Sequence, residues 1–461
     1  MKPKAVDSLL SVGRTGANQL AGWIPRQDAM QIGEEMYGLA RRLYPICRSI
    51  SGNGVRETLA VLHELIPLEI HEVASGTPVF DWTVPKEWNI RDAYIKNSRG
   101  ERVVDFQRSS LHVVNYSVPV RAKLRLPELR PHLHSLPEQP GWIPYRTSYY
   151  SESWGFCLAH KDLLTLSDDE YEVCIDSSLQ PGSLSYGEYF IPGSTNEEVL
   201  IYTHTCHPSL ANDNLSGIAV VTQLARLLAA RGSRYSYRFV FGPGTIGSIT
   251  WLSRNQERLQ RIRHGLVVVL VGDPGPLTYK RSRYGDAEID RVVQQVLRAG
   301  GRAHRIVDFS PYGYDERQFC SPGINLPMGR LTRTPNGEYP EYHTSADNLD
   351  LISPGTLAES FEACTQILNV LENNVRLRST QPNCEPQLGK RGLYAKTGGG
   401  KEVGQREYAL LWVLNLADGR HRLLDMLERS GLEPEPMYQA SRALLEAGLL
   451  EIVPENEEKR I

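Results

Sequence analysis

One segment of the sequence places two histidines and one aspartate between an expected strand and an expected helix. It runs from Thr203 to Gly217 and reads THTCHPSLANDNLSG, with His204, His207 and Asp213 inside it. Imidazole nitrogens and carboxylate oxygens are common zinc ligands. Asp213 could bind metal or cap the following helix, since Asp and Asn are also frequent N-cap residues. His207 is expected to line the pocket or to pack beneath it.

Three later segments add chemistry of the same kind. His343 lies in a loop rich in hydroxyl and carboxyl groups, from Glu338 to Asn348. Asp273 directly follows an apolar strand. Asp315 and Glu316 are neighbours that shortly precede the apolar residue Phe319. Each alone has an ordinary structural explanation, such as a capped turn or a packed histidine. Ligands of open α/β sheets bind at the carboxyl ends of the strands, so we expect these segments to converge there.

The elements that position these residues alternate between strand and helix from residue 186 onward. Apolar runs predict strands at 198–203, 237–241 and 265–272, and helical spacing predicts helices at 217–230, 287–297 and 355–373. Such alternation predicts an α/β fold with a mostly parallel sheet and flanking helices.

The rest of the chain divides by composition into four further regions. Two helices, expected at 28–43 and 55–66, precede the sheet, so residues 28–70 and 186–375 are predicted to form one α/β domain. Residues 71–185 are rich in Pro, Tyr, Trp and Val and predict a β-rich insertion. A polar, glycine-containing linker is expected at 381–404. Residues 405–461 show three short helices and a terminal strand, the pattern of a winged helix.

Bulk properties exclude several classes of protein. A chain of 461 residues exceeds the usual size of a single core, which predicts more than one domain. The formal net charge of -3 gives no general attraction to nucleic acid or anionic membranes. The expected winged helix has eleven acidic and seven basic residues, which argues against DNA binding. No apolar run is long enough to span a bilayer, and the seven scattered cysteines predict reduced thiols in a cytoplasmic protein.

Together the segments resemble the co-catalytic zinc aminopeptidase-like family. The segment from Ala211 to Gly217 is similar to its metal-bridging segment, and Tyr342-His-Thr-Ser-Ala-Asp347 matches its late histidine loop residue for residue. The whole chain most resembles a bacterial group of aminopeptidase-like proteins with a β-rich insertion and a C-terminal winged helix. The resemblance implies a site holding one or two zinc ions, with ligands His204, Asp213, Asp273 and His343.

The resemblance also suggests roles for residues around the metal. Asp315 matches a carboxylate that supports the site from behind, and Tyr342 belongs to the histidine loop. Three of these residues are predicted to contact the substrate: His207, Asp315 and Tyr342. The basic run that contains Arg281 is either a solvated turn or a clamp for a substrate carboxylate or phosphate.

One departure from that family concerns the general base. The family carries a Glu-Glu pair after the strand that follows the bridging aspartate, whereas this chain has Gly244 at about that place. Loss of a general base typically costs about 10²–10⁴-fold in rate. Glu316, Glu338 and Glu341 are the carboxylates that could substitute, and Glu316 is the predicted catalytic residue.

We therefore expect a zinc-dependent hydrolase of peptide or other amide bonds. Its substrate would be a small peptide or an N-acyl compound with a free terminus, and no nucleic acid or membrane partner is expected. The alternative is a metal-binding relative without ordinary activity, which serves binding or assembly and in which Gly244 marks the lost base. A regulator that binds DNA through the winged helix is a third hypothesis. The sequence leaves open whether the chain forms a homo-oligomer.

Overall fold

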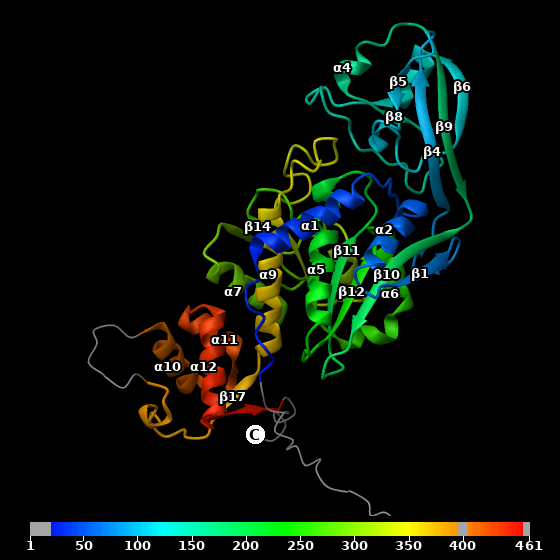
Figure 1. Cartoon of the computed structure of the whole chain (residues 1–461). Coiled ribbons are helices and arrows are strands. Elements are labelled where there is room, and N and C mark those ends of the chain that lie inside the picture. Colours follow the sequence, from blue (N-terminus) through cyan, green and yellow to red (C-terminus); the bar gives the residue numbers. More distant parts are fainter. Residues whose placement is uncertain (1–19, 395–403, 455–461) are drawn as a thin grey trace, which may run out of the picture. The chain divides into compact units, whose positions relative to one another are not determined.

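The computed structural model describes residues 20–394 and 404–454, and these form two compact units. One unit runs from Pro25 to Thr365 (Figure 1). The other combines the residues before Pro25 with those from Gln366 onward. In the described part of the chain, no helix is long and apolar enough to cross a membrane.

The larger unit is built on an eight-stranded sheet with the order β1-β10-β12-β11-β13-β16-β14-β15. Its four central strands, β12, β11, β13 and β16, are parallel, whereas β1 and β10 pair antiparallel with their neighbours. Strand β14 pairs antiparallel with β16 and parallel with β15. The sheet is therefore mixed, and only its centre matches the expected parallel arrangement. The strands are β1 Glu69–Ala74, β10 Ser183–Ile191, β11 Glu198–His204, β12 Ser236–Gly242, β13 Ile262–Val268, β14 Leu277–Lys280, β15 His304–Val307 and β16 Met328–Thr332.

Helices cover this sheet and begin near the ends of its strands. Every residue of β11 is buried, which explains its nearly continuous apolar sequence. Helix α5 packs on β11 and its neighbours, and α7 packs on β13 to β16. Asp28 caps α1 by accepting from the N–H groups of Met30 and Gln31. The helices are α1 Ala29–Leu43, α2 Asn53–His63, α5 Gly217–Ala229, α6 Ile246–Arg254, α7 Glu288–Ala299 and α8 Glu316–Phe319, and α9 Pro354–Asn373 extends into the second unit.

A β-rich segment lies between β1 and β10. Its four-stranded sheet has the order β5-β4-β9-β6 and is antiparallel throughout. Residues 71–74, expected in the insertion, instead pair with β10 in the main sheet. The strands are β2 Pro78–Val79, β3 Trp82–Thr83, β4 Glu87–Lys96, β5 Arg102–Asp105, β6 Val120–Arg125, β7 Leu133–His134, β8 Phe156–Cys157 and β9 Glu170–Gln180.

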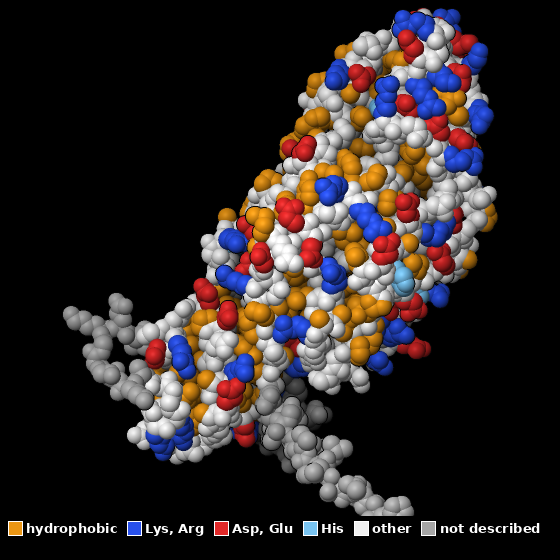
Figure 2. All heavy atoms as spheres, viewed as in Figure 1, with side chains coloured by type: hydrophobic (Ala, Val, Ile, Leu, Met, Phe, Trp, Pro, Cys, Tyr) orange, Lys and Arg blue, Asp and Glu red, His pale blue; other side chains and the backbone are white. Residues whose placement is uncertain are grey.

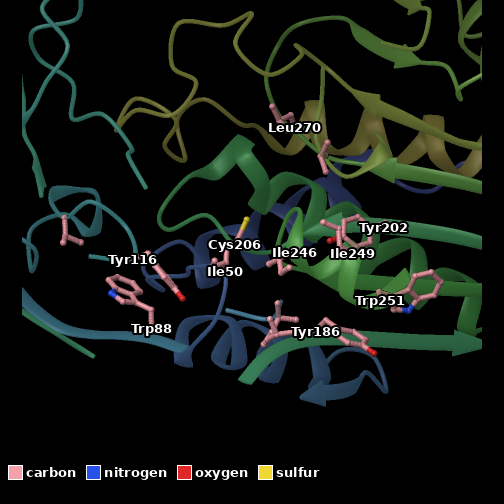
Figure 3. Close-up of a cluster of buried hydrophobic side chains, with 14 of the residues drawn as sticks. Ile50, Trp88, Tyr116, Tyr186, Tyr202, Cys206, Ile246, Ile249, Trp251 and Leu270 are labelled. Atoms are coloured by element: carbon pink, nitrogen blue, oxygen red, sulfur yellow. The ribbon is translucent and has the colours of Figure 1, made fainter. Parts of the chain in front are cut away.

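The insertion and the α/β part share one hydrophobic core. Trp88 and Tyr116 of the insertion belong to the same buried cluster as Tyr202 and Trp251 (Figure 3). Shared burial of large aromatic side chains makes the two parts one packed body, because separating them would expose this apolar surface. On the surface, basic and acidic side chains are interspersed over the face shown in Figure 2, in line with the small net charge.

The second unit contains α10 Gln405–Leu416, α11 Leu423–Ser430 and α12 Pro434–Glu446, close to the expected helices. Its sheet has the order β18-β17-β19, formed by Asp418–Arg422, Arg376–Ser379 and Leu450–Val453. The turn expected at 418–419 opens β18, and the central strand β17 precedes the expected linker. Part of that linker, 395–403, and the last residues, 455–461, lie outside the described residues.

Candidate metal site and substrate pocket

Asp213 lies in a turn that two flanking asparagines attach to the sheet. Asn214 donates from Nδ2 to Thr203 Oγ1 at 2.8 Å and to the His204 carbonyl at 2.9 Å, and its Oδ1 accepts from the Leu270 N–H at 3.0 Å. These bonds join the end of β11 to the segment after β13. The sequence places Asp213 beside this anchored residue, so its carboxylate has little freedom to move.

Asn212 makes the matching attachment on the other side of Asp213. Its Oδ1 accepts from the N–H groups of Gly272 at 2.9 Å and Asp273 at 3.2 Å, and its Nδ2 donates to Asp273 Oδ2 at 3.1 Å. The Asn-Asp-Asn sequence therefore works as a clamp, in which the outer amides fix the backbone. Asp213 itself is left to face the histidines.

Asp347, the last residue of the histidine loop, holds the same turn from outside. Its carboxylate accepts from the N–H groups of Asn212 at 2.6 Å and Asp213 at 3.0 Å, and from the Tyr339 hydroxyl at 3.3 Å. Burial and the nearby charge of Asp213 raise the pKa of Asp347 to about 8, although these hydrogen bonds oppose the shift. The sequence alone indicates no role for Asp347, yet it links the two motifs that carry the candidate ligands.

Three imidazoles face the carboxylate of Asp213. His204 Nε2 lies 2.8 Å from Oδ1, whereas His343 Nε2 and His207 Nε2 lie 3.2 and 3.8 Å from Oδ2. The candidate ligand atoms of His204, His207 and Asp213 all lie within 4.8 Å of one another. The structure thus brings His204, Asp213 and His343 together, and it adds His207, which the sequence had placed only at the pocket wall.

The electrostatics of the cluster suit a metal. Burial alone would raise the pKa of Asp213, but the facing histidines hold it well below its ordinary value. Burial lowers the pKa of His207 to about 3, so this imidazole is neutral near pH 7. A carboxylate and neutral imidazoles are the protonation states in which these side chains bind metal.

Asp273 is not part of this group, contrary to the expectation that it binds metal. Its carboxylate accepts from Thr334 Oγ1 at 2.6 Å, from the Thr334 N–H at 3.1 Å and from the Gly275 N–H at 2.8 Å, besides the Asn212 amide. The reason is the distance along the chain from the end of β13, because this strand ends at Val268. Asp273 lies five residues further on and closes a turn instead.

Asp315 supports His204 from behind. Its Oδ1 accepts from Ser248 Oγ at 2.7 Å, and its Oδ2 lies 3.8 Å from His204 Nδ1. Neither of these two facing atoms has a hydrogen-bond partner within the described structure. Burial raises the pKa of Asp315 to about 6, against the opposing effect of His204. A carboxylate behind a ligand histidine typically fixes the ring orientation, so the supporting role fits and contact with substrate does not.

Glu316 is not placed to act as a general base, which corrects its predicted catalytic role. It is fully buried and pairs with Lys280 Nζ at 2.9 Å and Arg330 Nη1 at 3.3 Å. Burial would raise the pKa of Glu316, but these two cations lower it. Of the other candidate bases, Glu338 is exposed and pairs with Arg305 at 2.6 Å. Within the described residues, the Glu341 side chain makes no hydrogen bond to the histidine cluster, and its carbonyl accepts from Thr344 Oγ1.

The place expected for a glutamate at Gly244 is filled by Tyr314. A Cβ atom at Gly244 would lie 2.3 Å from Tyr314 Cε1 and 2.9 Å from Asp315 Oδ2. The Tyr314 ring in turn packs against His204, with ring centroids 5.1 Å apart. The absence of a carboxylate here is therefore enforced by packing. The sequence indicates that the glutamate is missing, but no local pattern predicts that Tyr314 occupies its place.

The cluster lines a narrow pocket with an accessible volume of about 10 Å³, roughly the room for one water molecule. It is lined by His204, His207, Asp213, Val269, Leu270, Tyr314, Arg330, Asn336 and Tyr342. Tyr342 was predicted here, and its ring stacks on His343 at 3.9 Å. Arg281 is not among the lining residues, since its guanidinium pairs with Asp308 at 2.6 Å and Gln294 at 2.7 Å.

Two further residues beside the cluster come from different parts of the chain. The Tyr145 N–H of the insertion donates to the His343 carbonyl at 2.7 Å, and the Tyr145 ring lies 5.2 Å from His207 and 5.0 Å from His343 between centroids. Cys206 lies in the buried apolar cluster (Figure 3), and burial raises the pKa of its thiol. Cys206 is therefore a protonated core residue rather than a thiolate ligand or nucleophile.

Comparison with solved structures defines the class to which this fold belongs. BSAP, a zinc aminopeptidase from Bacillus subtilis, aligns over 75% of this chain and 95% of its own, with a TM-score of 0.55 and 12% identity. At this identity the likeness concerns the fold alone, which is that of the zinc aminopeptidases. A Clostridium acetobutylicum protein described as a "putative peptidase" aligns with a TM-score of 0.88 and 52% identity, over 92% of this chain and 97% of that one.

The chain belongs to the family described as "Domain of unknown function (DUF4910)", whose model matches residues 37–374. Residues 375–452 match a winged helix-turn-helix, in agreement with the fold predicted for the C-terminal segment. A relative from Clostridium acetobutylicum is 53% identical over 93% of this chain and 98% of its own length. It is named "Putative polysaccharide biosynthesis protein with aminopeptidase-like domain".

Proposed function

We propose that this protein is a zinc-dependent hydrolase of peptide or other amide bonds that acts on small substrates. The observation that carries the proposal is the convergence of His204, His207 and His343 on the carboxylate of Asp213, at the mouth of a pocket. The zinc aminopeptidase fold and the aminopeptidase-like relative support the same reaction class.

The donor set of the cluster fits a zinc ion. Imidazole and carboxylate are its usual ligands in enzymes. His343 Nε2 is buried and has no hydrogen-bond partner in the described structure, although it points toward Asp213. A buried donor or acceptor left unpaired costs about 1–3 kcal/mol, and a ligand bond removes that cost. When bound, zinc supplies Lewis acidity toward the carbonyl of a scissile amide.

The surrounding residues of the chain prepare the site for that reaction. Asp315 Oδ2 lies 3.8 Å from His204 Nδ1, the side from which a carboxylate typically orients a metal-binding imidazole. Tyr342 stacks on His343 and Tyr145 approaches it edge-on, so both limit the access of water to this imidazole. No glutamate in the described structure contacts the histidines in the manner of a general base. We therefore propose slow peptide turnover, about 10²–10⁴-fold below that of an enzyme with such a base.

A second candidate function is metal binding without turnover. The contact between Gly244 and Tyr314 favours it, since it leaves no space for a carboxylate at that position. Under this hypothesis the unit from Gln366 onward would serve assembly. We do not propose nucleic acid as its partner, because acidic residues outnumber basic ones between 404 and 454.

The deciding experiment measures metal and hydrolysis on the same preparations. Bound metal is counted by elemental analysis for the wild type, His343→Ala and the control His304→Ala, whose histidine lies in β15. Hydrolysis is followed on dipeptides, N-acyl amino acids and N-acylated sugars, the last included because of the name of the Clostridium relative. If His343→Ala alone loses both the bound metal and the turnover, the result supports a hydrolase. Metal without turnover on any substrate supports the second candidate, and no metal uptake rejects both.

A further inference from the structure

A buried arginine lines the pocket at the histidine cluster, and one edge of its guanidinium lacks hydrogen-bond partners. Arg330 of β16 lines this pocket with only 7% of its side chain exposed. Its Nη1 donates to Asn336 Oδ1 at 2.9 Å and lies 3.3 Å from Glu316 Oε1. The other edge is different: Nε is buried without a hydrogen-bond partner, and no bond from Nη2 occurs within residues 20–394 and 404–454.

The buried charges around Arg330 do not balance. Glu316 is one carboxylate facing two cations, Lys280 and Arg330. Lys280 is already satisfied, since its Nζ also donates to the Tyr312 carbonyl at 2.6 Å. Glu316 therefore does not neutralise both cations, and the other carboxylate of this pocket, Asp213, is the one that the histidines face. An uncompensated buried charge is costly, so this arrangement suits a pocket that receives an anion.

Other basic residues nearby do not present an open edge to this pocket. Arg281 is bound to Asp308 and Gln294. Arg333 donates to the carbonyls of Gly275 and Thr356 and pairs with Glu359. Arg330 is the arginine among the residues that line the pocket, and it shares the pocket with His204, His207 and Asp213.

We propose that Arg330 and Asn336 bind a carboxylate of the substrate while its amide bond lies at the histidine cluster. The ligand class is an N-acyl amino acid or a very short peptide with a free α-carboxylate. The free edge of a guanidinium matches the planar, two-oxygen geometry of a carboxylate. The accessible volume of this pocket is about 10 Å³, far below the usual range of about 300–1,000 Å³ for ligand pockets, so the ligand must be small and its binding must widen the pocket. This inference rests on the proposed function for the position of the amide, but the carboxylate subsite is testable without turnover.

The test compares two ligands that differ in one charge. Isothermal titration at fixed ionic strength measures the binding of N-acetylglycine and of N-acetylglycinamide to metal-free and zinc-loaded protein. The proteins are wild type, Arg330→Gln, Arg330→Lys and the control Arg281→Gln. We expect at least tenfold tighter binding of the carboxylate ligand to the wild type, from a charge-assisted hydrogen bond. Arg330→Gln should lose this preference, Arg330→Lys should keep part of it, and Arg281→Gln should keep all of it.

Several results would overturn the inference. Equal affinity of the wild type for both ligands removes the carboxylate subsite, and so does an unchanged preference in Arg330→Gln. Inorganic phosphate that binds tighter than either ligand, and that depends on Arg330, replaces the carboxylate with a phosphate group. Zinc content and thermal melting of Arg330→Gln should match the wild type, since the Lys280–Glu316 pair stays balanced. A wild type that takes up no zinc would reject the proposed hydrolase, while the charge preference of the metal-free protein would still decide this inference.

Discussion

Gly244 and Tyr314 are in such close contact that no side chain fits at position 244, because a Cβ there would lie 2.3 Å from Tyr314 Cε1. We predict that Gly244→Ala destabilises the protein by about 1–3 kcal/mol, the usual cost of overpacking. Thermal melting measures the effect. Gly232→Ala is the matched control, since a Cβ at Gly232 meets nothing within 4 Å. Tyr314→Ala should cost less stability when it is added to Gly244→Ala than when it is made in the wild type, and a purely additive double variant would contradict the contact.

His207 is predicted to contribute to metal binding, although the sequence placed it only at the pocket wall. His207→Ala should weaken zinc affinity at least tenfold, because it removes one of the imidazoles that face Asp213. Competition with a zinc chelator measures the affinity. The adjacent Cys206→Ala is the comparison: its Sγ lies 3.4 Å from His207 Nδ1, but burial keeps this thiol protonated, so its loss should weaken zinc affinity much less. The reverse order of effects would make Cys206 the ligand.

Glu316 distinguishes a structural role from a catalytic one. Glu316→Gln leaves Lys280 and Arg330 buried without a counter-charge, so we expect a loss of about 3–5 kcal/mol in the free energy of unfolding. Chemical denaturation measures this loss. A catalytic base would behave differently: its removal would lower turnover and leave stability unchanged.

Asp347 is predicted to affect both the free energy of unfolding and the affinity for zinc. Asp347→Asn keeps the size of the side chain but replaces one oxygen, so it cannot accept from both the Asn212 and the Asp213 N–H in the same way. We expect a loss of about 1–3 kcal/mol, the cost of a buried N–H without a partner, and weaker zinc binding as Asp213 shifts. Both quantities are measured on one preparation, and intact zinc affinity would show that Asp347 does not position Asp213.

The pH dependence of stability should reveal the ion pair between Arg56 and Glu87. Burial would raise the pKa of Glu87, but bonds from Arg56, the Ser183 N–H and Asn89 lower it to about 2. A lowered folded-state pKa gives stability that is complete above the ordinary value of 4.5 and is lost as the pH falls toward 2. The difference in melting temperature between wild type and Glu87→Gln should therefore be largest at pH 6 and shrink at pH 3. A difference that does not change with pH would contradict the prediction.

The sequence predicted much of the fold because local patterns determine it. The burial of β11 follows from its apolar run, and the carboxyl end of that strand leads directly to His204. The edges of the sheet were missed, because the antiparallel pairing of β14 with β16 depends on the path of the chain between them rather than on any local signal. The same holds for β17, which pairs with strands some 40 and 75 residues further along.

The candidate site divides in the same way. Asp213 and His343 were found because they lie in short motifs with recognisable neighbours. Arg330 was missed because a charged residue within a short apolar strand shows no sign of the pocket it faces. Arg281 and Asp273 were assigned wrongly to the site, since both lie near it in sequence but are bound to Asp308 and Thr334 instead. Sequence spacing indicates which residues follow the same strand, whereas the direction of each side chain depends on packing.

The hydrogen bonds between the insertion and the histidine loop have a thermodynamic consequence. Tyr145 donates to the His343 carbonyl, Ser345 donates to the Ile143 carbonyl, and Ile143 donates to Ser345 Oγ. A ligand that holds His343 in place must therefore also favour the docked state of residues 143–145. Linkage is reciprocal, so whatever loosens residues 143–145 weakens the binding of the ligand by the same factor. Zinc would then protect the insertion from hydrogen exchange and proteolysis, and affinity at the cluster could be tuned from a segment that carries none of its ligands.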